Sequence, residues 1–253
     1  MKARLAICAL SLAAGALPMC AWAEMASSNA VTIVLNSRNA VSAKTFAEAK
    51  AVLERDAAAG CPLQQFVVGV TTDDKALAKK YLEASRPRIR TLAEQKNNPF
   101  AWYLLSMENN DFTMLRRAAD GGNVQALNAL GTIATQEALA RNNISSNVLE
   151  NILHTSFDYF RKAAALRDPN GFINLGTCYL RGFGCKQDMS MAFSCFMAAA
   201  EMGHPEGMDN VSASYQFGHG VPKDEELCLW WAMRGRATRG DPAAEKWLKE
   251  RRK

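Results

Sequence analysis

Cysteine and histidine are the side chains that could support metal or nucleophilic chemistry in this chain, and both are sparse. The three histidines, His154, His204 and His219, are too far apart in the sequence for a zinc-binding motif. The sequence has no nucleophile elbow, and no cysteine and histidine occur in a recognisable catalytic context. We therefore predict no catalytic residues, no metal site, no cofactor and no enzymatic activity.

The cysteines have a second potential role in disulfide bonds, if the chain reaches an oxidising compartment. Cys178 falls in the last turn of an expected helix and Cys185 just after the following turn, so a bond between them would close that turn. Cys195 and Cys228 lie on neighbouring expected helices, three residues out of register. The alternative is that all the cysteines are small buried hydrophobic side chains. Because the number outside the first 23 residues is odd, at least one thiol stays free, and we expect it to be Cys61.

Polar and aromatic side chains on the first helix of each expected pair are candidates for binding a partner. A carboxamide is both donor and acceptor, so a row of asparagines could hydrogen-bond an extended peptide backbone. Asn174 and Asn210 are 36 residues apart, so we expect one to stand above the other. The alternative is that these side chains are only a solvated helix surface. The candidate partner-binding residues are Trp102, Tyr103, Asn128, Asn170, Asn174, Arg181, Asp209 and Asn210.

A repeat positions these residues. The segment that begins at Tyr179 recurs at Tyr215, with two glycines and an aspartate at the same places 36 residues later. The two aspartates, Asp188 and Asp224, are expected at the N-cap or first turn of the second helix of each unit. A repeat of this length predicts a stack of small units, each too thin to bury its own apolar face. Within a unit, apolar residues follow one another at spacings of three and four, which indicates helices. Two irregularities stand out: Arg86-Pro87 should interrupt a helix, and residues 135–146 replace the Gly-x-Gly turn of the third unit.

The pattern resembles the Sel-one-like repeat (SLR) family, which is related to the tetratricopeptide repeats. The match is strong over residues 169–253, moderate over 111–168 and weak over 45–110. The resemblance implies an all-α, right-handed αα-solenoid of about five helix-turn-helix repeats that binds proteins. Its motif positions in one unit are Leu175, Gly176, Tyr179, Gly182, Gly184, Asp188, Ala199, Ala200 and Gly203.

The amino-terminal segment has the composition of a secretory signal. Lys2 and Arg4 precede an uncharged apolar run, and Ala21-Trp22-Ala23 fits the small-x-small cleavage rule. We expect a signal peptide over residues 1–23, with a retained anchor as the alternative. A flexible mature amino terminus (24–43), degenerate helical repeats (44–110) and an SLR-type array with a capping helix (111–253) would follow. Of the 253 residues 49% are apolar and 22% charged, as in globular proteins.

The formal net charge is +5, and basic residues gather at the carboxyl end. They form either a patch for an anionic partner or the solvated surface of a capping helix, where cations suit the helix dipole. Basic and aromatic residues are not interleaved as in single-strand binders, so we expect no nucleic-acid partner. The basic residues are Arg234, Arg236, Arg239, Lys246, Lys249, Arg251, Arg252 and Lys253.

The sequence favours an adaptor in the bacterial envelope, periplasmic or secreted, that binds a protein or peptide in its concave groove. A hydrolase acting on cell-wall or β-lactam-type substrates is one alternative, although the candidate residues are nearly free of carboxylates and histidines. A secreted factor that acts on a host cell is the other. No membrane span is expected after the signal segment.

Overall fold

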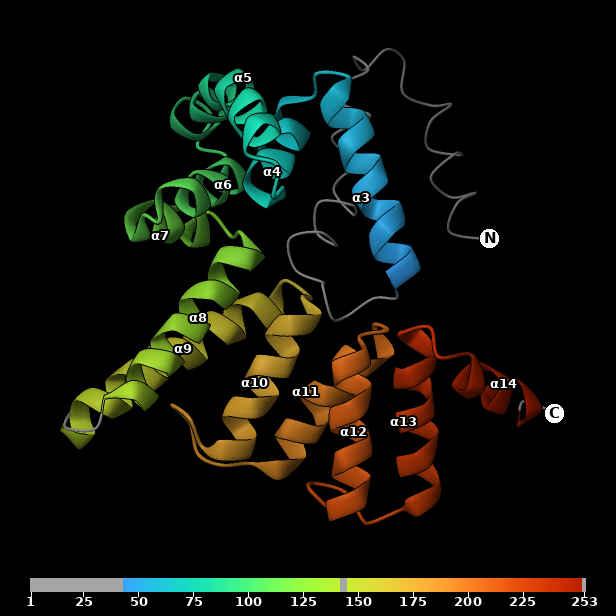
Figure 1. The fold of residues 1–253 in the computed structure, drawn as a ribbon. Coiled ribbons are helices and arrows are strands. Elements are labelled where there is room, and N and C mark those ends of the chain that lie inside the picture. Colours follow the sequence, from blue (N-terminus) through green and yellow to red (C-terminus); the bar gives the residue numbers. More distant parts are fainter. Residues whose placement is uncertain (1–42, 142–144, 252–253) are drawn as a thin grey trace, which may run out of the picture.

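The computed structural model describes residues 43–141 and 145–251, and within these ranges the chain is folded into twelve helices with no strand (Figure 1). The expected signal peptide and mature amino terminus before residue 43 lie outside the described residues. No helix of the described part is both long and apolar enough to cross a membrane. The helices are α3 (Ala43–Ala58), α4 (Pro62–Thr71), α5 (Lys75–Glu94), α6 (Pro99–Asn109), α7 (Phe112–Asp120), α8 (Val124–Ala140), α9 (Ser146–Ala165), α10 (Pro169–Arg181), α11 (Met189–Glu201), α12 (Pro205–Phe217), α13 (Glu225–Thr238) and α14 (Pro242–Glu250).

The helices are arranged as five consecutive hairpins, with α3 before them and α14 after them. Each hairpin packs on the next along the chain, and the hairpins follow an arc from α4 to α14 (Figure 1). In each hairpin the even-numbered helix comes first and the odd-numbered helix second. The predicted all-α solenoid of helix-turn-helix repeats is confirmed.

Side-chain caps determine where most helices begin. Asp188 and Asp224, predicted to cap second helices, accept hydrogen bonds from the backbone N–H groups of Met191 and Leu227, each at 2.9 Å. Five helices also begin with proline, whose missing N–H costs nothing at this position. His204, at the start of α12, departs from the rule because its side chain makes no capping hydrogen bond.

The second glycine of each Gly-x-Gly turn is a contact between neighbouring hairpins. Gly184 and Gly220 have φ angles of +66° and +78°, a conformation that side chains other than glycine rarely adopt. A methyl group at Gly184 would overlap the backbone carbonyl of Leu153, and one at Gly220 that of Met189. Leu153 and Met189 are themselves 36 residues apart, so the same close approach recurs.

An aromatic pair also recurs at each of these interfaces. The rings of Phe157 and Tyr179 meet edge to face at 5.5 Å and 87°, and those of Phe193 and Tyr215 at 5.5 Å and 82°. In each pair the phenylalanine lies on a second helix and the tyrosine on the next first helix. The repeated residues thus have equivalent surroundings, as a stack of similar units requires.

Helix α5 continues through Pro87, so the expected interruption at Arg86-Pro87 is wrong. Proline normally kinks or breaks a helix because it removes one N–H and crowds the preceding turn. Here one side chain next to the proline hydrogen-bonds within α5, and another ties α5 to α6. The Ser85 hydroxyl donates to the Tyr81 carbonyl at 2.6 Å, and Arg86 Nε donates to Glu108 Oε1 of α6 at 2.8 Å.

The third hairpin is longer than its neighbours. Helices α8 and α9 contain 17 and 20 residues, whereas α10 and α11 contain 13 each. The expected loss of the Gly-x-Gly turn is confirmed, because helix occupies most of residues 135–146. The pair projects beyond the adjacent hairpins (Figure 1). This extra length shifts the register between the two halves of the stack.

Candidate functional site

Three consecutive first helices, α6, α8 and α10, surround an open hollow of about 450 Å³. Four of its eight lining residues are carboxamides, and none of the lining side chains carries a charge. Ala129 and Ile133 of α8 form its apolar part. The lining residues are Tyr103, Gln125, Asn128, Ala129, Thr132, Ile133, Asn170 and Asn174.

Two of the carboxamides are linked to an aspartate at the start of α10. Asn174 Nδ2 donates to Asn128 Oδ1 at 3.3 Å, and Asn128 Nδ2 donates to Asp168 Oδ2 at 2.7 Å. The same Asp168 oxygen accepts the backbone N–H of Gly171 at 2.8 Å and so caps the helix. Asn128 and Asn174, which line the hollow, therefore belong to a connected polar chain that joins α8 to Asp168 at the start of α10.

The remaining polar groups of the hollow are available to a ligand. In the described part of the chain, the side chains of Gln125 and Asn170 make no hydrogen bond. Tyr103 is 9% exposed, and burial raises the pKa of its hydroxyl, which therefore stays protonated at neutral pH and can donate. A surface of this kind suits an uncharged ligand that has both hydrogen-bonding groups and an apolar part.

The hollow unites four of the eight predicted binding residues, Tyr103, Asn128, Asn170 and Asn174. The other four lie elsewhere. Trp102 is only 6% exposed and packs in the hydrophobic core. The prediction that it binds a partner from the surface of a first helix is therefore wrong. The indole is held there by a hydrogen bond from its Nε1 to Asn97 Oδ1 at 3.1 Å and by the Arg117 guanidinium, 4.9 Å from the ring centroid.

Arg181, Asp209 and Asn210 do not line the hollow. Arg181 is exposed at the end of α10, and Asp209 of α12 forms an ion pair with Arg239 of α13. Asn174 hydrogen-bonds to Asn128, in the preceding unit, rather than to Asn210. The row of asparagines therefore extends toward the amino terminus, in the direction opposite to the expected one.

Cys178, Cys185, Cys195 and Cys228 are free thiols. Cys178, Cys185 and Cys195 gather in one cluster, where burial raises the pKa of Cys178 to about 12 and that of Cys195 to about 11. Cys228 lies apart from them, with its sulfur 3.4 Å from the Ser212 hydroxyl. The two disulfides proposed from the sequence stay predictions. The raised pKa values make these thiols poor nucleophiles at neutral pH.

The basic carboxyl end is already paired within the chain. Arg236 pairs with Asp241, and the Arg234 guanidinium lies 4.6 Å and 4.8 Å from the ring centroids of Trp230 and Trp231. Lys246, Lys249 and Arg251 also have partners on their own helix or beside it. This favours the capping interpretation over a patch for an anionic partner. Arg252 and Lys253 lie outside the described residues.

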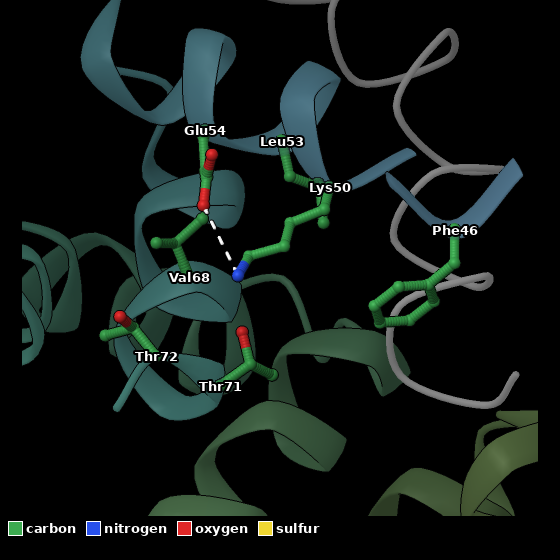
Figure 2. A pocket seen from close by; sticks show the side chains of 7 residues that line it. All are labelled: Phe46, Lys50, Leu53, Glu54, Val68, Thr71 and Thr72. Carbon is green, nitrogen blue, oxygen red and sulfur yellow. Dashed lines mark ion pairs between the residues drawn. The ribbon is translucent and has the colours of Figure 1, made fainter. Parts of the chain in front are cut away.

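A second hollow, of about 270 Å³, lies between α3 and α4 (Figure 2). The Lys50 ammonium and the Glu54 carboxylate are paired at 3.8 Å beside it. The Thr71 hydroxyl donates to the Val67 carbonyl at 2.7 Å. Because these polar groups already have partners, this hollow is the weaker candidate. No sequence pattern indicated this hollow, because the repeat is faint in this region.

Comparison with known proteins agrees with the architecture. The model of the Sel1 repeat family matches residues 147–168, 173–204 and 205–232, which fall within α9 to α13. The chain carries Sel1 repeats. Sel1 repeats form scaffolds for interactions between proteins, and the resemblance seen in the sequence is confirmed.

Solved structures and curated proteins were compared as well. A Sel1 repeat protein from Oxalobacter formigenes is 25% identical, with a TM-score of 0.42, and the match covers 49% of this chain and 88% of that chain. The protective antigen c5321 of uropathogenic Escherichia coli, which has an SLR fold, is 20% identical with a TM-score of 0.50. That match covers 78% of this chain and 44% of that chain, so this chain spans less than half the length of c5321. A search of the curated proteins found no match.

Asp168 is the residue of the site that sequence reasoning missed. It lies directly before Pro169, at the N-cap of α10, whereas the candidate binding residues were taken from within the helices. Its second role depends on Asn128, which lies in the preceding, longer unit. One sequence signal could have indicated this role of Asp168. It is an acidic N-cap residue directly before one first helix, combined with an asparagine on the preceding first helix.

Proposed function

We propose that this Sel1-repeat protein is an exported adaptor that binds an extended segment of a partner protein in the hollow between α6, α8 and α10. The observation that carries the proposal is the convergence of four carboxamides from two consecutive first helices on one hollow. Repeat proteins commonly bind partners along such a continuous surface, because it reaches across several units. The carboxamides can pair with peptide groups of any sequence, since each offers a donor and an acceptor.

The lining of the hollow favours binding over hydrolysis. Its one titratable side chain is Tyr103, whose raised pKa keeps it protonated at neutral pH. Hydrolysis of a cell-wall or β-lactam bond would require a base or nucleophile at the same place. Export is supported by the composition of residues 1–23, and an exported adaptor would act in the periplasm or outside the cell.

Site-specific photocrosslinking in the native host would test this function. A photoreactive residue at Thr132, in the hollow, is expected to capture a discrete protein from the envelope or the medium. The same residue at Ser194, exposed on the second helix α11, is the control and should not capture it. Equal capture from both positions would contradict binding in the hollow.

A double variant connects the capture to the carboxamides. Asn128→Ala together with Asn174→Ala should reduce capture at Thr132 at least fivefold, while the protein still folds. Asn210→Ala is the matched control, because it removes the same kind of side chain from a first helix outside the hollow. Unaltered capture by the double variant would show that these amides are only solvated surface.

A further inference from the structure

The hydrogen-bond partners of Asn128 and Asn174 determine which way each amide points. An ionised carboxylate only accepts hydrogen bonds, so Asn128 must turn its NH₂ group toward Asp168. The Asn128 Oδ1 then faces Asn174, which must donate a hydrogen bond to it from its own NH₂ group. The Asn174 Oδ1 is left as the end of the chain, and it makes no hydrogen bond to any described residue. Neither amide can flip without placing two acceptors or two donors against each other.

The carboxylate also strengthens the terminal acceptor. Hydrogen bonds to an ionised group are shorter and stronger than neutral ones, and the 2.7 Å contact between Asn128 Nδ2 and Asp168 Oδ2 is of this kind. Successive hydrogen bonds polarise one another in the same direction. Negative charge at Asp168 therefore makes the Asn174 oxygen a better acceptor than an isolated amide would be.

The next unit of the stack lacks this arrangement. His204 occupies the position equivalent to Asp168, 36 residues later in the sequence. The His204 side chain makes no capping hydrogen bond. Asn210, the counterpart of Asn174, lies on α12 outside the hollow, and its side chain makes no hydrogen bond to any described residue. The polarised chain therefore belongs to one place in the array, between α8 and α10, and is not a property of every unit.

We propose that Asp168 is a positioning residue that fixes Asn174 Oδ1 as the acceptor for one main-chain N–H of an extended peptide bound in the hollow. This inference rests on the proposed function and adds what the site recognises. Ala129 and Ile133 in the same hollow suit an aliphatic side chain of that peptide. An oligosaccharide also donates hydrogen bonds, but its hydroxyl-covered rings match this apolar part less well.

The test uses peptides selected from a random heptapeptide library on the full-length protein. The best binder is compared with versions of itself in which one amide at a time is N-methylated, which removes a single donor. With the unmodified protein, methylation at one position is expected to weaken binding at least tenfold. In Asp168→Ser the parent peptide should bind three- to tenfold more weakly, and the penalty at that position should fall below threefold.

Serine is chosen because it caps a helix about as well as aspartate does but is too short to reach Asn128. Asp188→Ser is the matched control, since Asp188 caps α11 in the same way without contacting an asparagine of the hollow. This variant should keep both the affinity and the tenfold penalty. A positional penalty in Asp168→Ser equal to that of the unmodified protein would overturn the inference.

Two further results separate this inference from the proposed function. If the selected peptides bind equally well to Ile133→Arg, which fills the hollow, then the hollow is not the binding site and the proposed function itself fails. If Ile133→Arg abolishes binding but every N-methyl version binds alike, the function holds and the role of Asp168 is wrong. A library without any binder, or tight binding of a neutral oligosaccharide such as maltoheptaose instead, would overturn both.

Discussion

The two ends of the stack have the same architecture but are joined in different ways. Between α9 and α13, neighbouring hairpins meet through a glycine on a backbone carbonyl and an edge-to-face aromatic pair, repeated every 36 residues. Between α5 and α6, the joint is the ion pair of Arg86 with Glu108. Left-handed asparagines replace glycines after these two helices, Asn97 after α5 and Asn110 after α6. The stack therefore requires hairpins that cover one another, but not one particular joint. Residues 147–232, which match the family model, include the regular joints.

The glycine joint should be the most sensitive element of this comparison. Gly184→Ala is expected to destabilise the protein by about 3 kcal/mol, because the left-handed backbone and the overlap with Leu153 both oppose a methyl group. Gly182→Ala is the control: its backbone is also left-handed, but the nearest atoms lie at 3.5 Å, so about 1 kcal/mol is expected. Urea unfolding would measure both. Equal losses of stability in the two variants would show that only the left-handed backbone matters and that the contact of Gly184 with Leu153 does not.

Breaking the amino-terminal joint should have the next largest effect. Arg86→Met leaves the Glu108 carboxylate, whose side chain is only 13% exposed, without its partner, and about 2 kcal/mol should be lost. Adding Glu108→Leu removes the stranded charge and should restore most of that loss. Thermal unfolding of the single and double variants provides the comparison. A double variant less stable than Arg86→Met would contradict this account of the joint.

The aromatic joint sharpens the claim that the regular units are equivalent. A double-mutant cycle on Phe193 and Tyr215, with leucine at each position, should give a coupling of about 1 kcal/mol. The same cycle on Phe157 and Tyr179 should agree with it within about 0.5 kcal/mol, because the two ring geometries match. Coupling energies that differ severalfold between the two pairs would show that equivalent positions of the repeat do not contribute equally to stability.

The smallest expected effect concerns His204, an N-cap residue whose side chain makes no capping hydrogen bond. Burial is the largest cause that lowers the pKa of His204 below 6.5, and Arg239 acts in the same direction, against Glu206, Asp168 and Asp209. The unfolded chain therefore takes up the proton first, so His204 should reduce stability as the pH falls below about 6.5. His204→Asn should remove that loss and add about 0.5–1 kcal/mol at neutral pH by supplying a cap.

Unfolding measured between pH 7.5 and 5 would show this difference. The control is His154→Gln, which replaces a histidine whose side chain is 64% exposed. An unchanged pH dependence in His204→Asn would rule out this histidine as its source.

The regular half of the fold could be read from the sequence, and the irregular half only in part. The 36-residue period, the Gly-x-Gly turns and the caps at Asp188 and Asp224 depend on local spacing, so they were predicted correctly. The continuation of α5 through Pro87 was not predicted, because it depends on a contact with another segment, the hydrogen bond of Arg86 to Glu108 in α6. Local propensity alone favours a break at that position.

The candidate site was predictable to a similar extent. Helical periodicity and the 36-residue period placed Asn128, Asn170 and Asn174 on first helices, and the hollow does contain them. The partner of Asn174 could not be deduced, because the long third hairpin puts 46 residues between it and Asn128. The burial of Trp102 was missed for the same kind of reason, since Arg117 and Asn97 hold the ring in the core. Neither contact follows from the spacing of a single helix.

The side-chain amide resonances of Asn128 and Asn174 provide the most direct test of the account. On addition of a peptide selected on the full-length protein, both amides should shift, together with backbone signals of α6, α8 and α10. Signals of the second helices α11 and α13 should change little. Shifts confined to those second helices, with the two asparagine amides unmoved, would contradict binding in the hollow between the first helices.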